Sequence, residues 1–341
     1  MDTRIAAARR PYNRASMADS LGPIPLPAAG QKTSGYFTFD DPQLAQFQWP
    51  YFAVSGTEPT QKRFILTAGI HAAEYTGILA AIQLGRLLTP EHVRGTIVVI
   101  PLLNRPGFFE RCIYVNPVDN DNINRVFPGS PSGPWSERFA YHLLNDIVVK
   151  CDYAMDLHAG DMIEDLDPFV SMRETGNAEV DAVAREMCNS YGVRWSMVAM
   201  PSGERAGLLF AAAAERGVPA IIAESGRCGL PEQDAIQRHV DGVLNIWRTL
   251  GLLTDSPPRG VEPPRVLKAF EWLRSAHEGI FLNRVAVKDA VRAGQQLGQM
   301  VDLLGNPLEE IQSPVDGVVL FTVTSPAIKK DGLLLGIGVP G

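Results

Sequence analysis

Two potential metal ligands, His71 and Glu74, stand three residues apart directly after an apolar run that starts at Phe64. The run is typical of a buried strand, and small residues then lead into a helix expected over about 74–88. In open α/β sheets the crevice lies beyond the carboxyl ends of the strands, so both side chains would point into it. Because such a pair often occurs by chance, it is only a weak indication of a metal site when taken alone.

A second histidine follows another expected strand, in Asp156-Leu-His158. Residues two apart on a strand face the same way, so Asp156 and His158 would project to one side together. The pair offers a ligand and a carboxylate that orients its imidazole N–H, which is the usual arrangement around zinc histidines. A catalytic zinc takes three protein ligands and leaves a fourth position for water. The sequence therefore favours a divalent metal site made by His71, Glu74 and His158 over three separate structural residues.

Glu224 ends a further apolar strand, in Ile-Ile-Ala-Glu224-Ser-Gly. A zinc hydrolase needs a base that takes a proton from water and returns it to the leaving nitrogen, and a carboxylate beside the metal can do both. A helix N-cap or an ion pair would be the structural alternative. Its position at the carboxyl end of a strand favours the catalytic role.

The loop over about 104–135 is rich in proline, glycine and asparagine, and its length indicates either function or disorder. It contains Asn104-Arg105, Arg111 and Asn124-Arg125. An arginine binds a carboxylate through two parallel hydrogen bonds, and an adjacent asparagine can add another donor. The loop is therefore a candidate anion-binding segment, although a surface salt bridge is the expected role of Arg105.

The composition excludes several functional classes. The 341 residues are 45% hydrophobic and 20% charged, and the net charge of −7 gives no electrostatic footprint for nucleic acid or an anionic membrane. Four scattered cysteines without C-x-x-C spacing suit reduced thiols. No signal peptide is evident, and no segment approaches the ~20 apolar residues of a membrane span. We expect a soluble, cytoplasmic enzyme with a small-molecule substrate, and a homo-oligomer is compatible with this expectation.

Strands and helices alternate along most of the chain, which indicates an α/β fold. We expect strands over 48–54, 63–70, 96–103, 151–157 and 218–223, and helices over 74–88, 178–191 and 232–250, with a further helix capped by Ser136. Continuous apolar strands are typical of parallel sheets that are buried on both faces.

The proline-rich segment 254–264 is the best domain boundary in the sequence. We expect an N-terminal arm over 1–40, because this region is rich in alanine, proline, glycine and serine. Residues 41–254 would form the catalytic domain. Short β-like runs separated by turn residues predict a small all-β domain over 255–341.

Together these motifs resemble the succinylglutamate desuccinylase/aspartoacylase family of zinc-dependent amidohydrolases, which are relatives of the zinc carboxypeptidases. The similarity runs in order over about residues 45–250, from Gly-Ile-His71-Ala-Ala-Glu74 through Asn104-Arg105-Pro-Gly and Asn122-Ile-Asn124-Arg125 to Asp156-Leu-His158 and Ala-Glu224-Ser-Gly. It implies a carboxypeptidase-like α/β/α sandwich around a mixed, largely parallel sheet. The C-terminal part resembles the small β domain of longer bacterial members, and we expect it to be a substrate-shaping or oligomerising lid.

The resemblance also implies the roles of the candidate metal site. One zinc ion (Zn2+) per chain would be bound by His71, Glu74 and His158, and Glu224 would activate the water.

The resemblance implies substrate-binding roles as well. Asn124 and Arg125 match the pair that holds a substrate carboxylate, and Asn104 is a further substrate-binding candidate. Asp156 matches the aspartate that supports a ligand histidine. Arg111 is the candidate for the arginine that polarises the scissile carbonyl.

The expected activity is removal of an N-acyl group, such as acetyl or succinyl, from an amino acid or similar small carboxylate. A zinc carboxypeptidase acting on peptides shares the metal set and would be favoured by a wide, open cleft. A binding protein that keeps the fold without catalysis is the other alternative. A serine or cysteine hydrolase is disfavoured, because Ser225 lies outside a G-x-S-x-G elbow and Cys112 and Cys228 lack the context of a nucleophile.

Overall fold

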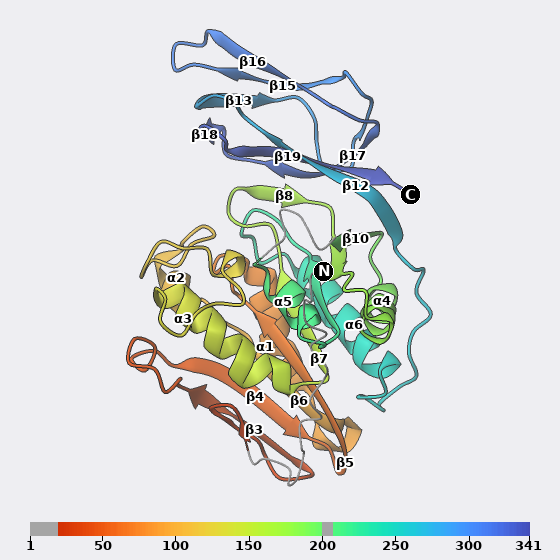
Figure 1. The fold of residues 1–341 in the computed structure, drawn as a ribbon. Helices are drawn as coiled ribbons and strands as arrows, with labels where there is room; N and C mark the ends of the chain where they lie inside the picture. Colours follow the sequence, from red (N-terminus) through yellow and green to blue (C-terminus); the bar gives the residue numbers. More distant parts are fainter. Residues whose placement is uncertain (1–19, 200–206) are drawn as a thin grey trace, which may run out of the picture.

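The computed structural model describes residues 20–199 and 207–341. A mixed sheet with helices on both faces forms the main body, and the C-terminal strands lie beyond one end of it (Figure 1). Within these two ranges, no helix has both the length and the apolar character needed to cross a membrane. The expected α/β class is confirmed.

The central part of the main sheet has the strand order β10-β9-β11-β7-β5-β6-β4-β3. The strands are β3 (Gln31–Phe37), β4 (Trp49–Ser55), β5 (Glu58–Ala68), β6 (Arg94–Ile100), β7 (Tyr153–His158), β9 (Phe169–Arg173), β10 (Trp195–Ala199) and β11 (Ala220–Glu224). β6, β5, β7 and β11 run parallel, whereas β4 and β9 are antiparallel to their neighbours β6 and β11. The carboxyl ends of β5, β7 and β11 therefore meet at one edge of the sheet.

Helices cover both faces of this sheet. One face carries α1 (Tyr75–Leu87), α4 (Ala178–Tyr191) and α6 (Gln233–Thr249), and the other carries α3 (Trp135–His142), its π-helical continuation Leu143–Ile147, and α5 (Leu209–Glu215). A short α2 (Arg105–Glu110) and three single 3-10 turns, Pro90–His92, Ile123–Arg125 and Val148–Lys150, lie in the connections. Along β5, Ile65 joins one core while Phe64 and Leu66 join the other, so both faces of the strand are apolar.

The C-terminal strands belong to two sheets. They are β12 (Arg265–Arg274), β13 (Gly279–Asn283), β14 (Ala290–Val291), β15 (Gln296–Val301), β16 (Pro307–Gln312), β17 (Gly317–Val323), β18 (Ala327–Ile328) and β19 (Leu333–Pro340). β16, β15, β13 and β18 form a separate antiparallel sheet, as expected, whereas β14, β17, β19 and β12 continue the main sheet beyond β10.

A second pairing also joins the two parts of the chain. β8 (Glu164–Leu166) comes from the α/β part and pairs antiparallel with β17, with Phe321 opposite Leu166. In Figure 1, β8 lies next to the C-terminal strands and above the body of the α/β part. Both parts of the chain therefore contribute strands to the boundary between them.

The described part of the expected N-terminal arm, residues 20–40, is packed instead. β1 (Ser20–Leu21) and β2 (Ile24–Pro25) pair with each other, and β3 is the edge strand of the main sheet. Leu21 and Ile24 are fully buried and belong to the same core cluster as Phe139 of α3, so the apolar residues of this segment add to the core. Residues 1–19 lie outside the described residues.

The start of α3 also differs from the expectation, because Ser136 is not its N-cap. The helix begins at Trp135, after Pro134, and Ser136 lies in the first turn. Asp119 in the long loop accepts hydrogen bonds from Ser136 N at 2.7 Å and from Ser136 Oγ at 2.8 Å. A loop carboxylate thus satisfies a first-turn N–H group that a cap residue would otherwise satisfy.

Gly77 in the first turn of α1 allows this helix to pack tightly on β7. A Cβ atom at Gly77 would lie 2.9 Å from the Leu157 carbonyl oxygen, which is closer than side chains pack against backbone. We expect Gly77→Ala to lower the free energy of unfolding by about 1–3 kcal/mol, the usual cost of overpacking, in urea titrations. Gly260→Ala is the control, because nothing lies within 4 Å of its Cβ position. Equal effects of the two substitutions would contradict the close contact.

Candidate metal centre

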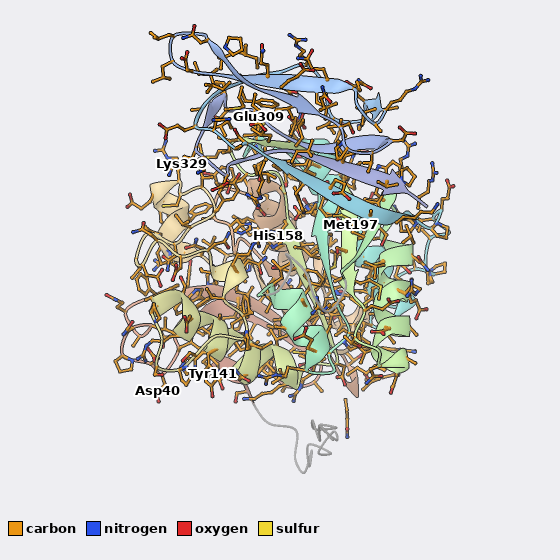
Figure 2. All side chains as sticks on the ribbon, turned by 45° about the horizontal axis from the view of Figure 1, so that its top comes forward. Asp40, Tyr141, His158, Met197, Glu309 and Lys329 are labelled. Carbon is orange, nitrogen blue, oxygen red and sulfur yellow. The ribbon has the colours of Figure 1, made fainter. Side chains whose placement is uncertain are left out.

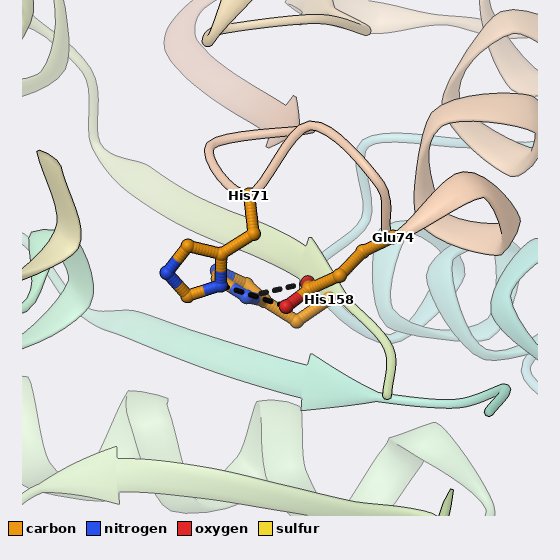
Figure 3. Close-up of side chains that lie close together, drawn as sticks. All are labelled: His71, Glu74 and His158. Carbon is orange, nitrogen blue, oxygen red and sulfur yellow. Dashed lines mark hydrogen bonds and ion pairs between the residues drawn. The ribbon is translucent and has the colours of Figure 1, made fainter. Parts of the chain in front are cut away.

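Three side chains meet at the carboxyl edge of the central strands. His71 and Glu74 lie in the turn between β5 and α1, and His158 ends β7 (Figure 3). All three are buried, and one possible ligand atom from each lies within 4.8 Å of the others. Figure 2 shows His158 well inside the molecule. Two imidazole nitrogens and a carboxylate at this spacing can hold one divalent cation.

The Glu74 carboxylate lies between the two imidazoles. Its Oε1 is 2.7 Å from His71 Nδ1, and its Oε2 is 2.8 Å from His158 Nδ1. The same Oε2 accepts a hydrogen bond from Ala159 N at 3.0 Å. Both Nδ1 atoms therefore face the third candidate ligand.

The opposite nitrogen of each imidazole faces a hydrogen-bond acceptor. His158 Nε2 donates to Asp156 Oδ2 at 2.9 Å, and Thr67 Oγ1 donates to Asp156 Oδ1 at 2.6 Å. His71 Nε2 donates to Asn122 Oδ1 at 3.1 Å. These contacts leave the lone pairs on the Nδ1 atoms, which is the tautomer that a metal ion requires. Asp156 thus lies where the sequence predicted it, behind a candidate ligand.

The electrostatics of the group fit a cation. Burial alone would lower the pKa of His158, but the carboxylates of Glu74 and Asp156 outweigh it and raise that pKa well above its usual value. Burial alone would raise the pKa of Glu74, yet His158 and His71 lower it to about 2. This buried site keeps its carboxylate ionised and attracts positive charge. It is therefore suited to a metal ion, which would take the place of a proton on the histidines.

A cavity of about 190 Å³ is lined by the three candidate ligands and by residues from both parts of the chain. The α/β part contributes Arg125, Glu164 and Glu224, among others. The C-terminal strands contribute Trp272, Arg274, Phe321 and Leu333. The C-terminal part therefore forms one wall of this cavity, which we call the site pocket.

Glu224 lies at the end of β11, next to the end of β7. The two strands are parallel, and Glu224 is paired in register with His158. Glu224 also lines the site pocket. The structure therefore brings this carboxylate to the same edge as the candidate metal ligands.

Asn124 and Arg125 reach the site pocket on a 3-10 turn, and both line it. Arg125 Nη1 donates to Asn124 O at 2.8 Å, and burial lowers the pKa of this arginine. Asn124 Oδ1 accepts from Leu209 N at 2.9 Å, which ties the turn to α5, while its Nδ2 lies 3.4 Å from His158 Nε2. The Asn124 side chain is thus engaged within the protein, while Arg125 brings a positive charge to the site pocket.

Arg111 and Asn104 do not line the site pocket. Arg111 follows α2 with a left-handed φ of 54°, and its side chain is exposed. Asn104 is fully buried and caps α2, since its Oδ1 accepts from Gly107 N at 3.0 Å and its Nδ2 donates to Val115 O at 3.2 Å. The structure therefore places neither residue at the site pocket, and Asn104 caps a helix.

The sequence alone did not indicate Arg274 or Glu164 as site residues. Glu164 begins the three-residue strand β8, and Arg274 ends β12. No motif surrounds either residue. The only local signal is the alternation of Phe270, Trp272 and Arg274, which places the arginine on the same face of β12 as two aromatic residues.

His239 on α6 holds two strand ends together behind the candidate ligands. It is fully buried, and its Nε2 donates to His158 O at 2.9 Å and to Ser225 O at 3.1 Å. Its Nδ1 accepts from the Tyr191 hydroxyl at 2.6 Å. These bonds require the neutral imidazole, and burial lowers the pKa of His239 to about 4.

This low pKa predicts a pH dependence of stability. The usual pKa of 6.5 is higher, so the unfolded chain binds an extra proton between about pH 6.5 and pH 4. The stabilisation is fully present above pH 6.5 and is lost as the pH falls toward 4, by roughly 3 kcal/mol in all. In urea unfolding of the metal-free protein, we expect the free energy of unfolding to fall more steeply between pH 6.5 and pH 4 for wild type than for His239→Gln.

The exposed His277 provides the control for this prediction. His277→Gln should keep the pH dependence of the wild type, because the His277 side chain is exposed and not buried behind the candidate ligands as His239 is. Parallel curves for wild type and His239→Gln would contradict the assignment to His239.

The fold and the site together define the class of the protein. It is an α/β protein with a mixed sheet covered on both faces and a candidate metal centre at the carboxyl ends of its central strands. The family model described as the succinylglutamate desuccinylase/aspartoacylase catalytic domain matches residues 60–250, more than half of the chain. The chain belongs to this family, which confirms the resemblance seen in its motifs.

Known proteins of similar sequence and fold agree with this placement. The N-alpha-acetyl-L-2,4-diaminobutyric acid deacetylase of Halomonas elongata is 29% identical over 264 residues, which are 75% of each chain. The product-bound structure of the ectoine utilization protein EutE (DoeB) from Ruegeria pomeroyi has a TM-score of 0.81 at 22% identity, covering 93% of this chain and 99% of that one. A succinylglutamate desuccinylase/aspartoacylase from Rhodobacter sphaeroides has a TM-score of 0.79 at 22% identity, covering 91% and 95%. The structural likenesses concern the fold, including the C-terminal strands.

Proposed function

We propose that this protein is a zinc-dependent hydrolase that removes an N-acyl group from an amino acid or a similar small carboxylate. The observation that carries the proposal is the convergence of His71, Glu74 and His158 in a pocket that also contains Glu224 and Arg125. Family membership supports it, and so does the name of the Halomonas elongata relative, a deacetylase of an N-acetylated diamino acid.

The candidate ligands and Glu224 would carry the chemistry. A zinc ion held by His71, Glu74 and His158 would polarise the amide carbonyl and lower the pKa of a water molecule to about 7. Glu224 would accept a proton from the attacking water and deliver it to the amide nitrogen as the C–N bond breaks. Asp156 would keep the His158 ring in its orientation.

Arg125 and Arg274 would bind the substrate carboxylate. A guanidinium matches a carboxylate with two parallel hydrogen bonds, and Arg125 lines the site pocket close to the candidate ligands. Arg274 would add a second positive charge from the C-terminal wall. Binding the carboxylate sets the register of the substrate, so that its acyl amide lies at the metal centre.

The site pocket favours a small substrate over a peptide. Trp272, Phe321 and Leu333 form one wall, and the cavity of about 190 Å³ is smaller than typical ligand pockets. A carboxypeptidase would need room for a polypeptide that continues beyond the cleaved bond. The C-terminal wall therefore supports the substrate-shaping role expected for this part of the chain.

A substrate panel tests the proposal. The zinc-loaded protein would be incubated with N-acetyl, N-succinyl and N-formyl amino acids, with Nα-acetyl-2,4-diaminobutyrate, and with short peptides, and the released amine would be measured by chromatography. We expect hydrolysis of at least one acylated amino acid and none of the peptides. Cleavage of peptides alone would favour the carboxypeptidase, and no turnover by zinc-replete protein would favour a binding role.

A further inference from the structure

The site pocket is lined by charged groups of both signs. Arg125 and Arg274 provide positive charge, and Glu164 on β8 provides a carboxylate near the C-terminal wall. Over residues 20–199 and 207–341, no arginine or lysine nitrogen lies within 4.0 Å of this carboxylate. Within the described chain, Glu164 therefore lacks a direct ion pair.

The Glu164 carboxylate is held in position by its neighbours. Its Oε2 accepts from Asp161 N at 3.0 Å, and the Tyr114 hydroxyl hydrogen-bonds to it. Tyr114 N in turn donates to Asp161 Oδ2 at 3.0 Å. The backbone is fixed as well, because Glu164 pairs with Val323 of β17. These contacts hold an acidic group at the pocket wall.

Burial makes the ionised form of Glu164 unfavourable. Burial raises the pKa of Glu164 to about 7, and the hydrogen bonds from Asp161 and Tyr114 only partly oppose this rise. Glu74 adds a like charge nearby, which raises the pKa of Glu164 further. The positive charge of Arg125 acts on this carboxylate without a direct ion pair, and a cationic group that enters with a ligand would supply a partner in contact with it.

We infer that Glu164, positioned by Tyr114, is a specificity-determining residue that binds a second, cationic amino group of the substrate. The inference rests on the proposed deacylase function. The preferred substrate would then carry a carboxylate, an acyl amide and an ammonium group. Arg125 and Arg274 would bind the first and Glu164 the last. With both ends of the substrate held, only one of its two nitrogens could present an acyl group to the metal centre.

Two pairs of ligands of nearly equal shape test the inference. The side chain of L-2,4-diaminobutyrate ends in an ammonium group, and that of L-norvaline ends in a methyl group at the same position. Their Nα-acetyl derivatives differ in the same way. By calorimetry with zinc-loaded protein, we expect wild type to bind diaminobutyrate about tenfold or more tightly than norvaline, as one charge-assisted hydrogen bond would provide. In Glu164→Gln this preference should fall to about threefold or less. The kcat/KM ratio of the two acetylated compounds should change in parallel.

Asp165→Asn is the matched control, because it removes the same charge from the adjacent position of β8, which does not line the site pocket. It should keep the preference for diaminobutyrate. Tyr114→Phe should weaken the preference, because the hydroxyl that positions Glu164 is lost. Should Glu164→Gln not fold, Glu164→Asp takes its place, since the shorter side chain withdraws the carboxylate and must also reduce the preference.

Binding of the free amino acids is measured without turnover, so the inference and the proposed function can fail separately. Equal binding of diaminobutyrate and norvaline to wild type would overturn the inference even if acyl amino acids are hydrolysed. An unchanged preference in Glu164→Gln would overturn it too. A preference that depends on Glu164, in a protein that hydrolyses no acyl amino acid, would support the recognition and refute the deacylase.

Discussion

Replacing Glu224 by glutamine is expected to lower kcat by about 100- to 10,000-fold while the protein still binds zinc. Glutamine has nearly the same shape but cannot accept a proton from water and return it to the leaving nitrogen. Glu224 lies at the pocket wall, in register with His158 on the neighbouring strand. The measurement is steady-state kinetics on a hydrolysed acyl amino acid, with zinc content determined on the same sample.

Glu186→Gln is the control for this substitution, because Glu186 is exposed on α4, away from the site pocket. It should leave both kcat and zinc content unchanged. Near-normal kcat in Glu224→Gln would exclude Glu224 from proton transfer. Loss of zinc in this variant would make it a metal ligand instead.

Removing the metal is expected to abolish hydrolysis and to lower the melting temperature. The buried group of His71, Glu74 and His158 attracts positive charge, and a cation that binds only the folded state stabilises it. At a free zinc concentration of about a thousand times Kd, this stabilisation is about 4 kcal/mol. Treatment with a chelator should reduce activity to background, and about one equivalent of zinc per chain should restore it.

A histidine substitution separates the metal site from general effects of the chelator. His158→Ala should lose both zinc and activity, whereas His277→Ala, at an exposed position, should retain both. Full activity in metal-free wild type would refute the zinc dependence. Zinc bound in equal amount by His158→Ala would remove His158 from the ligand set.

The part of the site that stands on the central strands could be predicted from the sequence. His71, His158 and Glu224 follow apolar runs, and parallel strands buried on both faces bring their carboxyl ends to one edge. The apolar pattern identifies each strand, and the topology of such sheets then brings their ends together. The proximity of these residues could therefore be predicted without knowledge of contacts between distant segments.

Helix α4 shows that local signals can also determine boundaries. Its range of 178–191 agrees with the prediction because both ends are marked by suitable residues. Asn177 Oδ1 accepts from Glu179 N at 3.2 Å and from Val180 N at 3.4 Å, and Gly192 ends the helix with a left-handed φ of 90°. α3 lacked such a signal, because Asp119 acts on its first turn from a distant loop position.

The particular residues of the C-terminal wall could not be predicted, because they reach the site pocket through pairing between distant segments. β8 has only three residues, two of them acidic, and it is a strand because β17 lies beside it more than 150 residues later in the chain. Glu164 and Arg274 enter the site pocket through this pairing. Arg111 shows the converse case, since this arginine of the long loop has the chemistry of an anion-binding residue and yet is exposed, outside the lining of the site pocket.

The contribution of the last strands to the pocket wall has a consequence for the order in which the protein matures on the ribosome. The candidate metal ligands and Glu224 are all translated by residue 224, whereas the wall formed by Trp272, Arg274, Phe321 and Leu333 is translated afterwards. Under the proposed function, the residues that would bind the cation are thus translated before those that would discriminate among substrates. The wall is complete only when β19 has emerged and paired with β12 and β17.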